Sequence, residues 1–229
     1  FSQIKELKVT PPRFTGIDDV TSLLEKKEPQ LINDYVKRNF QYPDHIYGVN
    51  VHEGTEVVRF TILPTGELTD FIVINSVSPA IDDETIRVLK SSSGMWVPGT
   101  SDEKPVAMKR EVSLKIKLGD SEESAREKDF LEIARSNFTK ACEKLFDGDN
   151  PKRALKYFDK GIMYRPNDHS LLYMRGLCRY ELGDKNGARE DWSRLKGLGG
   201  GDVEPVFFSE KTRDLKGYDE MVDILNKIE

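Results

Sequence analysis

Hydrophobic and polar positions alternate along three stretches in the first half of the chain. The first stretch is residues 56–63, and the second is residues 67–75. Between them lies Pro-Thr-Gly, a sequence typical of a tight turn. The two stretches are therefore predicted to be strands of a β-hairpin. On the first strand, one face carries Val58, Phe60 and Ile62, and the other carries Arg59 and Thr61.

The third stretch, Val106–Leu118, shows the longest alternation. Its apolar positions are Val106, Met108, Val112, Leu114, Ile116 and Leu118, and charged residues at Lys109, Glu111, Lys115 and Lys117 lie between them. One polar and one apolar face are typical of an antiparallel strand whose helices cover a single side. This stretch is predicted to be the last strand of the sheet.

Two helical patterns accompany these strands. One begins at Asp18-Asp19 and ends near Lys37-Arg38, and the other spans residues 82–90, with acids at its start and a lysine at its end, as the helix dipole favours. The predicted order is helix, strand, strand, helix, strand. The fold class is therefore α+β, with a small three-stranded antiparallel sheet and two helices on one face. Such a sheet leaves an unpaired edge, and the last strand is the candidate.

The second half of the chain is helical and contains a repeat. Ile133–Pro166 aligns with Asn167–Gly200, giving two units of 34 residues. A Gly-Asp pair recurs at 148–149 and 183–184, one residue out of step. An amphipathic helix in residues 207–229 is predicted to cap the open end of the stack. The equivalent positions are Cys142 with Gly176, Ala154 with Ala188, and Phe158 with Trp192.

These patterns predict two domains, residues 1–119 and 120–229. The 229 residues have a net charge of −5, and no apolar run approaches the roughly 20 residues of a membrane span. The lack of a basic excess argues against nucleic acid as a partner. The chain begins at Phe1, so any signal peptide or membrane anchor is expected upstream of it. We expect a cleaved signal peptide, with a boundary inside a longer anchored protein as the alternative.

No set of residues indicates catalysis, a metal or a cofactor. His45, His52 and His169 have no carboxylate or cysteine at ligand spacing, and no phosphate-binding or nucleophile motif is present. Cys142 and Cys178 do not have metal-ligand spacing, and they are predicted to be two buried thiols, with a disulfide as the alternative. We therefore expect a protein that is not an enzyme.

Two family resemblances follow from these stretches. Six motifs in order resemble the C-terminal domain of TonB, in the form seen in the Bacteroidetes, and together they cover residues 11–118. Residues 133–200 resemble tetratricopeptide repeats in their period and in the positions of alanine, glycine and proline. The six motifs are PPRF (11–14), YP (42–43), EGTEVVRFTILPTGEL (53–68), INSVSPAIDDETIRVL (74–89), MWVPG (95–99) and KPVAMKREVSLKIKL (104–118).

The first resemblance implies a docking domain that adds a short extended peptide, the TonB box of an outer-membrane transporter, to its open sheet edge. The edge it implies is the last strand. In that family Trp96, Pro98 and Gly99 would connect the second helix to the last strand and hold it against the sheet. The implied edge residues are Val106, Met108, Lys109, Arg110, Glu111, Val112, Ser113, Leu114 and Lys115.

The second resemblance implies a short groove that binds a second protein. Its candidate lining residues are Tyr157, Tyr164, Tyr173, Arg175 and Arg179, for which packing and solvent-exposed positions are the alternative. Ala154, Gly176 and Ala188 would be structural positions that let paired helices approach closely.

The resulting hypothesis is a periplasmic, non-enzymatic adaptor. Its partners would be an outer-membrane TonB-dependent transporter or another component of the TonB system, and a second protein held by the repeats. The alternative is a scaffold or regulatory protein of the cell envelope whose TonB-like domain only packs or self-associates. The first resemblance also allows a homodimer, because open-edged domains of this family can exchange strands.

Overall fold

The computed structural model describes residues 8–16, 28–42, 53–116, 123–200 and 210–226. Its contacts divide the chain into two compact units, Phe1–Leu118 and Gly119–Glu229. Each unit has a hydrophobic core of its own.

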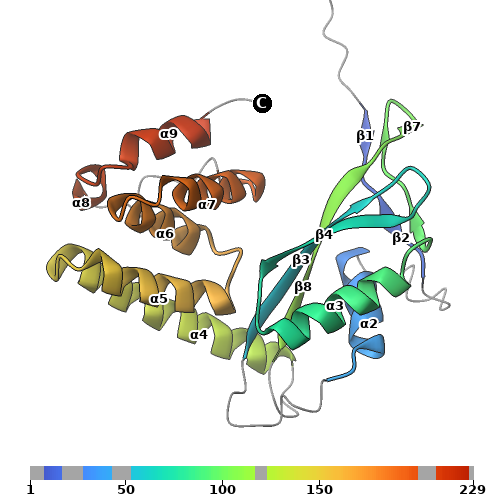
Figure 1. Ribbon diagram of the computed structural model, residues 1–229, viewed down its shortest axis with the longest axis horizontal. Coiled ribbons are helices and arrows are strands. Elements are labelled where there is room, and N and C mark those ends of the chain that lie inside the picture. Colours follow the sequence, from blue (N-terminus) through green and yellow to red (C-terminus); the bar gives the residue numbers. More distant parts are fainter. Residues whose placement is uncertain (1–7, 17–27, 43–52, 117–122, 201–209, 227–229) are drawn as a thin grey trace, which may run out of the picture. The chain divides into compact units, whose positions relative to one another are not determined.

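The first unit is built on an antiparallel sheet with strand order β4-β3-β8 (Figure 1). The strands are β3 (Gly54–Ile62), β4 (Leu68–Asn75) and β8 (Met108–Ile116). Val58, Phe60 and Ile62 are fully buried, as the alternation predicted. The opposite face of β3 is less exposed than predicted, because Thr55 and Val57 are also buried. β3 is the central strand, so side chains from both neighbours flank that face.

Two helices pack against the inner face of this sheet and share one core with it. They are α2 (Glu28–Asn39) and α3 (Pro79–Ser91). The predicted start of the first helix, at Asp18-Asp19, lies outside the described residues. α3 begins three residues before the predicted start, because Ser78 accepts a hydrogen bond from the Ile81 N–H as the N-cap and Pro79 suits the first turn. The predicted α+β class is confirmed.

Short strands that the hydrophobic pattern did not predict bind residues 8–16, here called the N-terminal arm, to the rest of the first unit. β1 (Val9–Thr10) pairs with β6 (Thr100–Ser101), which also pairs with β7 (Lys104–Pro105). β2 (Arg13–Phe14) pairs with β5 (Trp96–Val97). The arm therefore lies along residues 95–102, which lead into β8 but are not part of it.

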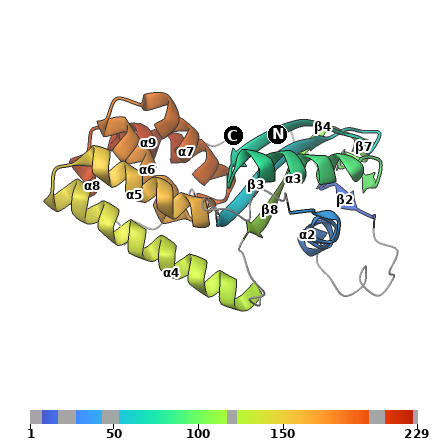
Figure 2. The same ribbon diagram turned by 60° about the horizontal axis from the view of Figure 1, so that its bottom comes forward.

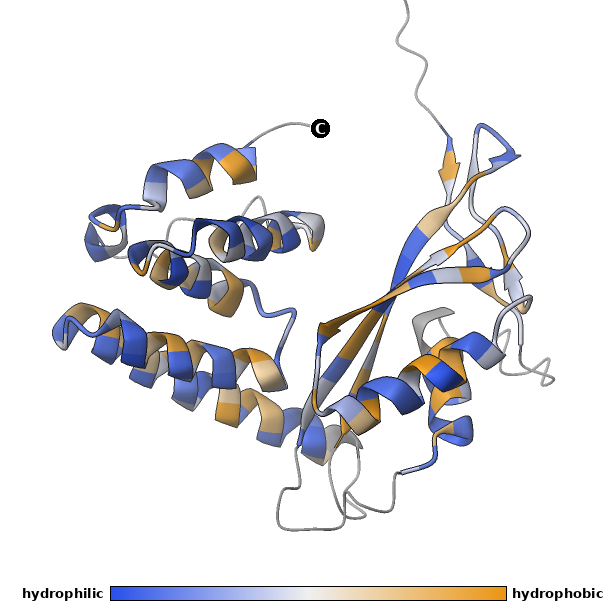
Figure 3. Ribbon diagram, in the orientation of Figure 1, coloured by the Kyte–Doolittle hydropathy of each residue, from blue (hydrophilic) through white to orange (hydrophobic). Residues whose placement is uncertain are grey.

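The second unit is made of antiparallel helix pairs. α4 (Glu123–Cys142) continues into the π-helix η2 (Glu143–Asp147) and packs along α5 (Pro151–Tyr164), as Figure 2 shows. α6 (His169–Glu181) packs along α7 (Lys185–Gly197) in the same way. Hydrophobic and hydrophilic residues are mixed along each of these helices, as expected of amphipathic elements (Figure 3).

The C-terminal segment forms two short helices rather than the single predicted one. They are α8 (Glu210–Arg213) and α9 (Tyr218–Asn226), and α9 packs against α7. The chain turns between them, where the Leu215 N–H donates to the Thr212 carbonyl and the Tyr218 N–H to the Leu215 carbonyl. Met221 is buried as predicted, while Ile228 lies outside the described residues.

The two Gly-Asp pairs are 35 residues apart, but the backbone conformation of the two loops repeats with the 34-residue period. Asp149 and Gly183 lie 34 residues apart, and both have a positive φ, of 41° and 87°. The next residues, Asn150 and Asp184, are both N-caps, with side chains that accept hydrogen bonds from the backbone N–H three residues on, at 3.0 and 2.9 Å. The conformational equivalent of Gly183 is thus Asp149, a residue tolerated in the left-handed region.

Candidate functional site

The open edge of the sheet belongs to β8. This strand pairs with β3 in an unbroken antiparallel register of nine residues, from Gly54 opposite Ile116 to Ile62 opposite Met108. On its other side, no strand among the described residues pairs with it. The N-terminal arm pairs with β5 and β6 instead. Within the described part of the chain, the outer side of β8 is therefore an open sheet edge.

The opposite edge, on β4, is much less regular. Its register with β3 shifts twice, between Val57 and Val58 and between Arg59 and Thr61. Asp70 in the middle of β4 has a φ of 52°, which an extended strand does not allow. Such irregularities bend a strand and interrupt its hydrogen bonding, so they protect an edge from pairing. Of the two edges, β8 is the one whose geometry suits strand addition.

Side chains on β8 follow the predicted alternation. Val112, Leu114 and Ile116 are buried against the helices. On the other face, Lys109 is exposed, and Ser113 and Lys115 are partly exposed. Glu111 accepts two hydrogen bonds from the guanidinium of Arg59, its neighbour across the ladder, at 2.9 and 2.7 Å.

The remaining predicted edge residues lie at the start of the strand. Met108 and Arg110 are partly buried on the same face as the core residues. Val106 precedes the strand, and its N–H donates to the Gly99 carbonyl at 2.9 Å. The structure thus places Met108 to Lys115 on one continuous edge and Val106 in the turn before it. Their contact with a partner stays a prediction.

Trp96 lies at the centre of an aromatic cluster in the first unit. Its ring is 5.1 Å from Phe14 on β2 and 5.5 Å from Phe60 on β3. The indole N–H donates to Ser92 Oγ at 3.3 Å, just beyond α3, and only 5% of the residue is exposed. Gly99 is also a packing position, since an added Cβ would lie 2.3 Å from Met108 Sδ. These contacts fit the structural role predicted for the Trp-Val-Pro-Gly segment.

Glu56 is a buried carboxyl group that the sequence reasoning missed. It lies on the core side of β3, in phase with Val58 and Phe60, and is fully buried. Its Oε2 accepts from the Val77 N–H at 2.9 Å, and no donor among the described residues reaches its Oε1. Burial raises the pKa of Glu56 from 4.5 to about 8; the Val77 N–H opposes this rise, and the nearby Asp82 adds to it.

The raised pKa of Glu56 predicts a loss of stability with rising pH. From about pH 4.5 to about pH 8, the folded state holds a proton that the unfolded state releases, so the free energy of unfolding falls as pH rises. The full loss is on the order of 5 kcal/mol and is present above pH 8. Glu56→Gln is expected to remove this dependence, and to raise the unfolding free energy at pH 8.5 with little change at pH 5.

Urea denaturation at the two pH values tests this expectation. Glu53→Gln, a change at a partly exposed carboxyl three residues away, is the matched control. Equal pH dependence in the wild type and in Glu56→Gln would contradict it.

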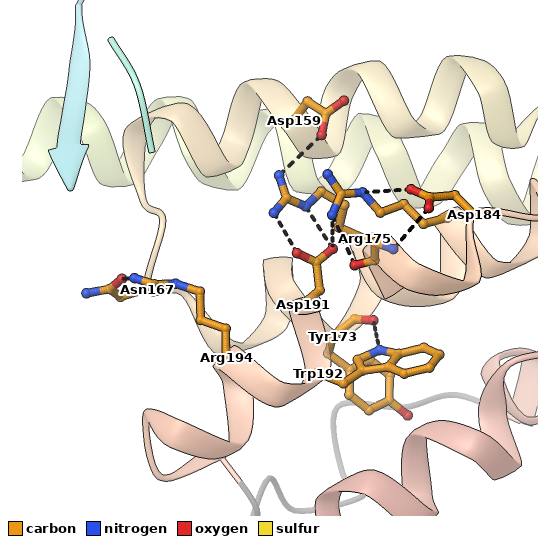
Figure 4. Close-up of polar contacts among 10 residues, drawn as sticks. Asp159, Asn167, Tyr173, Arg175, Asp184, Asp191, Trp192 and Arg194 are labelled. Carbon is orange, nitrogen blue, oxygen red and sulfur yellow. Dashed lines mark hydrogen bonds and ion pairs between the residues drawn. The ribbon is translucent and has the colours of Figure 1, made fainter. Parts of the chain in front are cut away.

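In the second unit, the predicted groove arginines are engaged in an ion-pair network (Figure 4). Arg175 on α6 donates to both carboxylate oxygens of Asp191 on α7, at 3.0 and 2.6 Å, and to Asp159 on α5 at 3.3 Å. Arg179 donates to Asp191 Oδ2 at 3.0 Å. Asp191 is 3% exposed; burial raises its pKa, and its hydrogen bonds from Arg175 oppose that rise. The network joins three consecutive helices.

The predicted groove tyrosines lie in different environments. Tyr173 on α6 is 3% exposed, and its carbonyl accepts from the Trp192 indole at 3.3 Å. Tyr164 packs edge-on against Phe130, and Tyr157 is partly buried against the core. The five candidate residues thus all make contacts within the unit. A role for them in binding a second protein stays a prediction.

Small residues occupy the points where the paired helices come closest. Ala154 on α5 and Ala188 on α7 are both fully buried. A Cβ on Gly176 would lie 2.2 Å from Trp192 Nε1, closer than real atoms approach. Gly176 therefore makes room for the Trp192 ring.

Gly176→Ala is expected to lower the free energy of unfolding by about 1–3 kcal/mol, because the added methyl group displaces Trp192 and strains a packed core. Thermal unfolding followed by circular dichroism measures the effect. Gly197→Ala is the matched control, since nothing lies within 4 Å of the added Cβ and alanine favours helix. Equal melting temperatures for Gly176→Ala and the wild type would show that this contact is not tight.

The cysteines are free thiols, not the disulfide that the sequence left open. Burial raises the pKa of Cys142 to about 11 and that of Cys178 to about 12, so both are protonated and unreactive at neutral pH. Within the described ranges, no group of three or more His, Cys, Asp or Glu residues could hold a metal ion. His45 and His52 lie outside those ranges, and His169 begins α6. Nor does any described helix have the length and apolar character to cross a membrane.

Comparison with known proteins finds a family match within the first unit. Residues 39–118 match the family model of the Gram-negative bacterial TonB protein C-terminal domain. This part of the chain is thus similar to the TonB C-terminal domain, a non-catalytic family. No tetratricopeptide family matches the helical unit, so that assignment stays a prediction.

One solved structure is also similar: the NMR solution structure of the TonB C-terminal domain of Helicobacter pylori, residues 194–285. It is 21% identical and covers 41% of this chain and 100% of that chain, with a TM-score of 0.31. At this TM-score the two structures agree too loosely to transfer residue positions between them. No curated protein matches the chain.

Proposed function

We propose that the chain is a periplasmic adaptor that binds an extended peptide along β8. The observation that supports this most strongly is the nine-residue register of β8 with β3, with no described strand on its outer side. An extended segment gains affinity from main-chain hydrogen bonds when it joins such an edge, and selectivity from alternate side chains. The match of residues 39–118 to the TonB family suggests the TonB box of an outer-membrane transporter as the segment.

The charges of β8 favour a peptide with acidic residues. Lys109 and Lys115 lie on the outward face, and the carboxylate between them, Glu111, is already paired with Arg59. An added strand on this edge would therefore pass the exposed Lys109, next to a carboxylate that is already paired. Binding of this kind weakens with salt, because exposed charges are screened.

The helical unit supplies the second half of the adaptor. Two helix pairs with a shared period form a stack of the kind that usually binds peptides or protein surfaces. We propose that it holds a second protein while the sheet edge holds the transporter. The family of the first unit suggests the periplasm as the site of action.

Main-chain recognition can be tested with N-methylated peptides. A TonB-box peptide is prepared in two forms, with methyl groups on the odd or on the even backbone nitrogens. An added strand directs alternate N–H groups toward its neighbour, so one form is expected to lose binding by at least tenfold and the other to keep it. Fluorescence polarisation with the full chain measures both. Equal losses, or none, would exclude strand addition and favour a scaffold whose TonB-like domain only packs or self-associates.

The basic face is tested by reversing its charges. Lys109→Glu with Lys115→Glu is expected to weaken binding of an acidic TonB-box peptide about tenfold at low salt, and less at 0.5 M salt, because screening reduces both the attraction and the repulsion. Lys160→Glu, at an exposed site on α5, is the control and is expected to bind like the wild type. If the reversed pair binds as well as the control at low salt, the peptide does not lie along this face.

A further inference from the structure

The two repeats of the helical unit present the same pair of side chains at the same place. Phe146-Asp147 ends η2, and Tyr180-Glu181 ends α6, exactly one 34-residue period later. Each pair combines an aromatic ring with a carboxylate at the C-terminal end of a helix. Rings attract cations through their faces, carboxylates attract them directly, and the helix dipole adds to both. Each repeat therefore offers a place for a cation.

The chain's own C-terminal segment, residues 210–217, lies on both pairs. Lys211 Nζ is 3.1 Å from Asp147 Oδ1 and 6.0 Å from the centre of the Phe146 ring. Five residues later, Lys216 Nζ is 3.2 Å from Glu181 Oε2, and the Lys216 N–H donates to the other oxygen at 2.6 Å. One lysine of the segment thus meets the acid of each repeat.

The space around the second pair is also filled closely. A Cβ on Gly217 would lie 2.7 Å from the Tyr180 ring, so the backbone of the segment lies directly against that ring. The cation above this ring is Lys185 of the same unit, at 5.2 Å. Between the two lysines, Thr212 is 2% exposed and hydrogen-bonds to the Tyr173 side chain. Tyr173, a predicted groove residue, is therefore covered by the segment.

The ionic contacts of the segment are exposed. The side chains of Lys211 and Lys216 are 61% and 73% exposed in their ion pairs. Ion pairs at such positions contribute little to stability. Thr212 and Gly217 are buried and Leu215 is partly buried against the core, while the other five residues of the segment are exposed. Segments held mainly through exposed side chains open more readily than the core.

We propose that Phe146-Asp147 and Tyr180-Glu181 form a binding surface for a partner protein segment with two lysines about five residues apart, and that residues 210–217 occupy this surface as an internal ligand. The internal ligand would raise the affinity that a partner needs, because a tethered segment is present at high effective concentration. The inference rests on the part of the proposed function that gives the helical unit its own partner. It does not depend on the sheet edge.

A peptide with the sequence of residues 210–217, Glu-Lys-Thr-Arg-Asp-Leu-Lys-Gly, is the probe. The full chain with Lys211→Glu and Lys216→Glu repels its own segment from the two acids, so it is expected to bind the labelled peptide at least tenfold more tightly than the wild type. Adding Asp147→Lys and Glu181→Lys should abolish this binding. A peptide with both lysines replaced by glutamate should instead bind the full chain that carries only Asp147→Lys and Glu181→Lys, because the lysines of that chain's own segment are repelled from the reversed positions.

Lys152→Glu with Lys160→Glu, two exposed lysines on α5, is the matched control and should bind the probe no better than the wild type. If the charge-reversed segment destabilises the fold, Lys211→Ala with Lys216→Ala is used, with an expected gain of at least threefold. No gain in either variant, or binding that persists after the acids are reversed, overturns the proposal and leaves residues 210–217 as a structural cap. TonB-box peptide binding is measured on the same variants and should not change, which separates this result from a failure at β8.

Discussion

The uninterrupted ladder between β3 and β8 is the constraint on which the first unit depends. Because nine successive residues stay in register, every second side chain of β8 is directed to the core and every other one away from it. A slip of one residue would move Val112, Leu114 and Ile116 to the outer face. The same regularity that secures the core also keeps the main chain of β8 straight and accessible. Stability and the capacity for recognition thus have one origin in this strand.

The helical unit depends on a different constraint, which is close approach at repeated positions. Gly176 admits the Trp192 ring, and Asp191 receives two guanidiniums in a site that is 3% exposed. A buried carboxylate without those partners would carry a large desolvation cost. Arg175 and Arg179, which the sequence suggested as binding residues, therefore form ion pairs that link α5, α6 and α7. The proposed binding surface lies instead at the ends of η2 and α6.

Much of the fold could be predicted because its signals are periodic. Alternation located the three long strands, and the 34-residue repeat located the helix pairs. The two-residue strands β1, β2 and β5 to β7 could not be predicted, since they are too short for a period and form through contacts distant in sequence. Glu56 was within reach of the sequence, because it is in phase with Val58 and Phe60. Its burial depends on the α3 corner near Val77, which alternation does not reveal.

The strand that carries the candidate site could be predicted, whereas the contacts of its residues could not. The resemblance identified the edge strand, and the structure shows an open edge there. The tyrosines and arginines chosen in the helical unit proved to be engaged within it, because side-chain type does not indicate which helix face meets a neighbour. The contacts of residues 210–217 with Asp147 and Glu181 depend on a turn that brings the end of the chain back over the repeats, and no local pattern encodes that return.

The irregular course of β4 has a consequence for assembly. A sheet grows without limit only if each added copy exposes a new edge as good as the one it covered. Here one side of the sheet is bent by the backbone at Asp70, so only one side can accept a strand. Under the proposed strand addition, pairing through β8 would end after a single event, with a peptide or with one other copy. An edge that is regular on one side of the sheet only does not support the growth of a fibre.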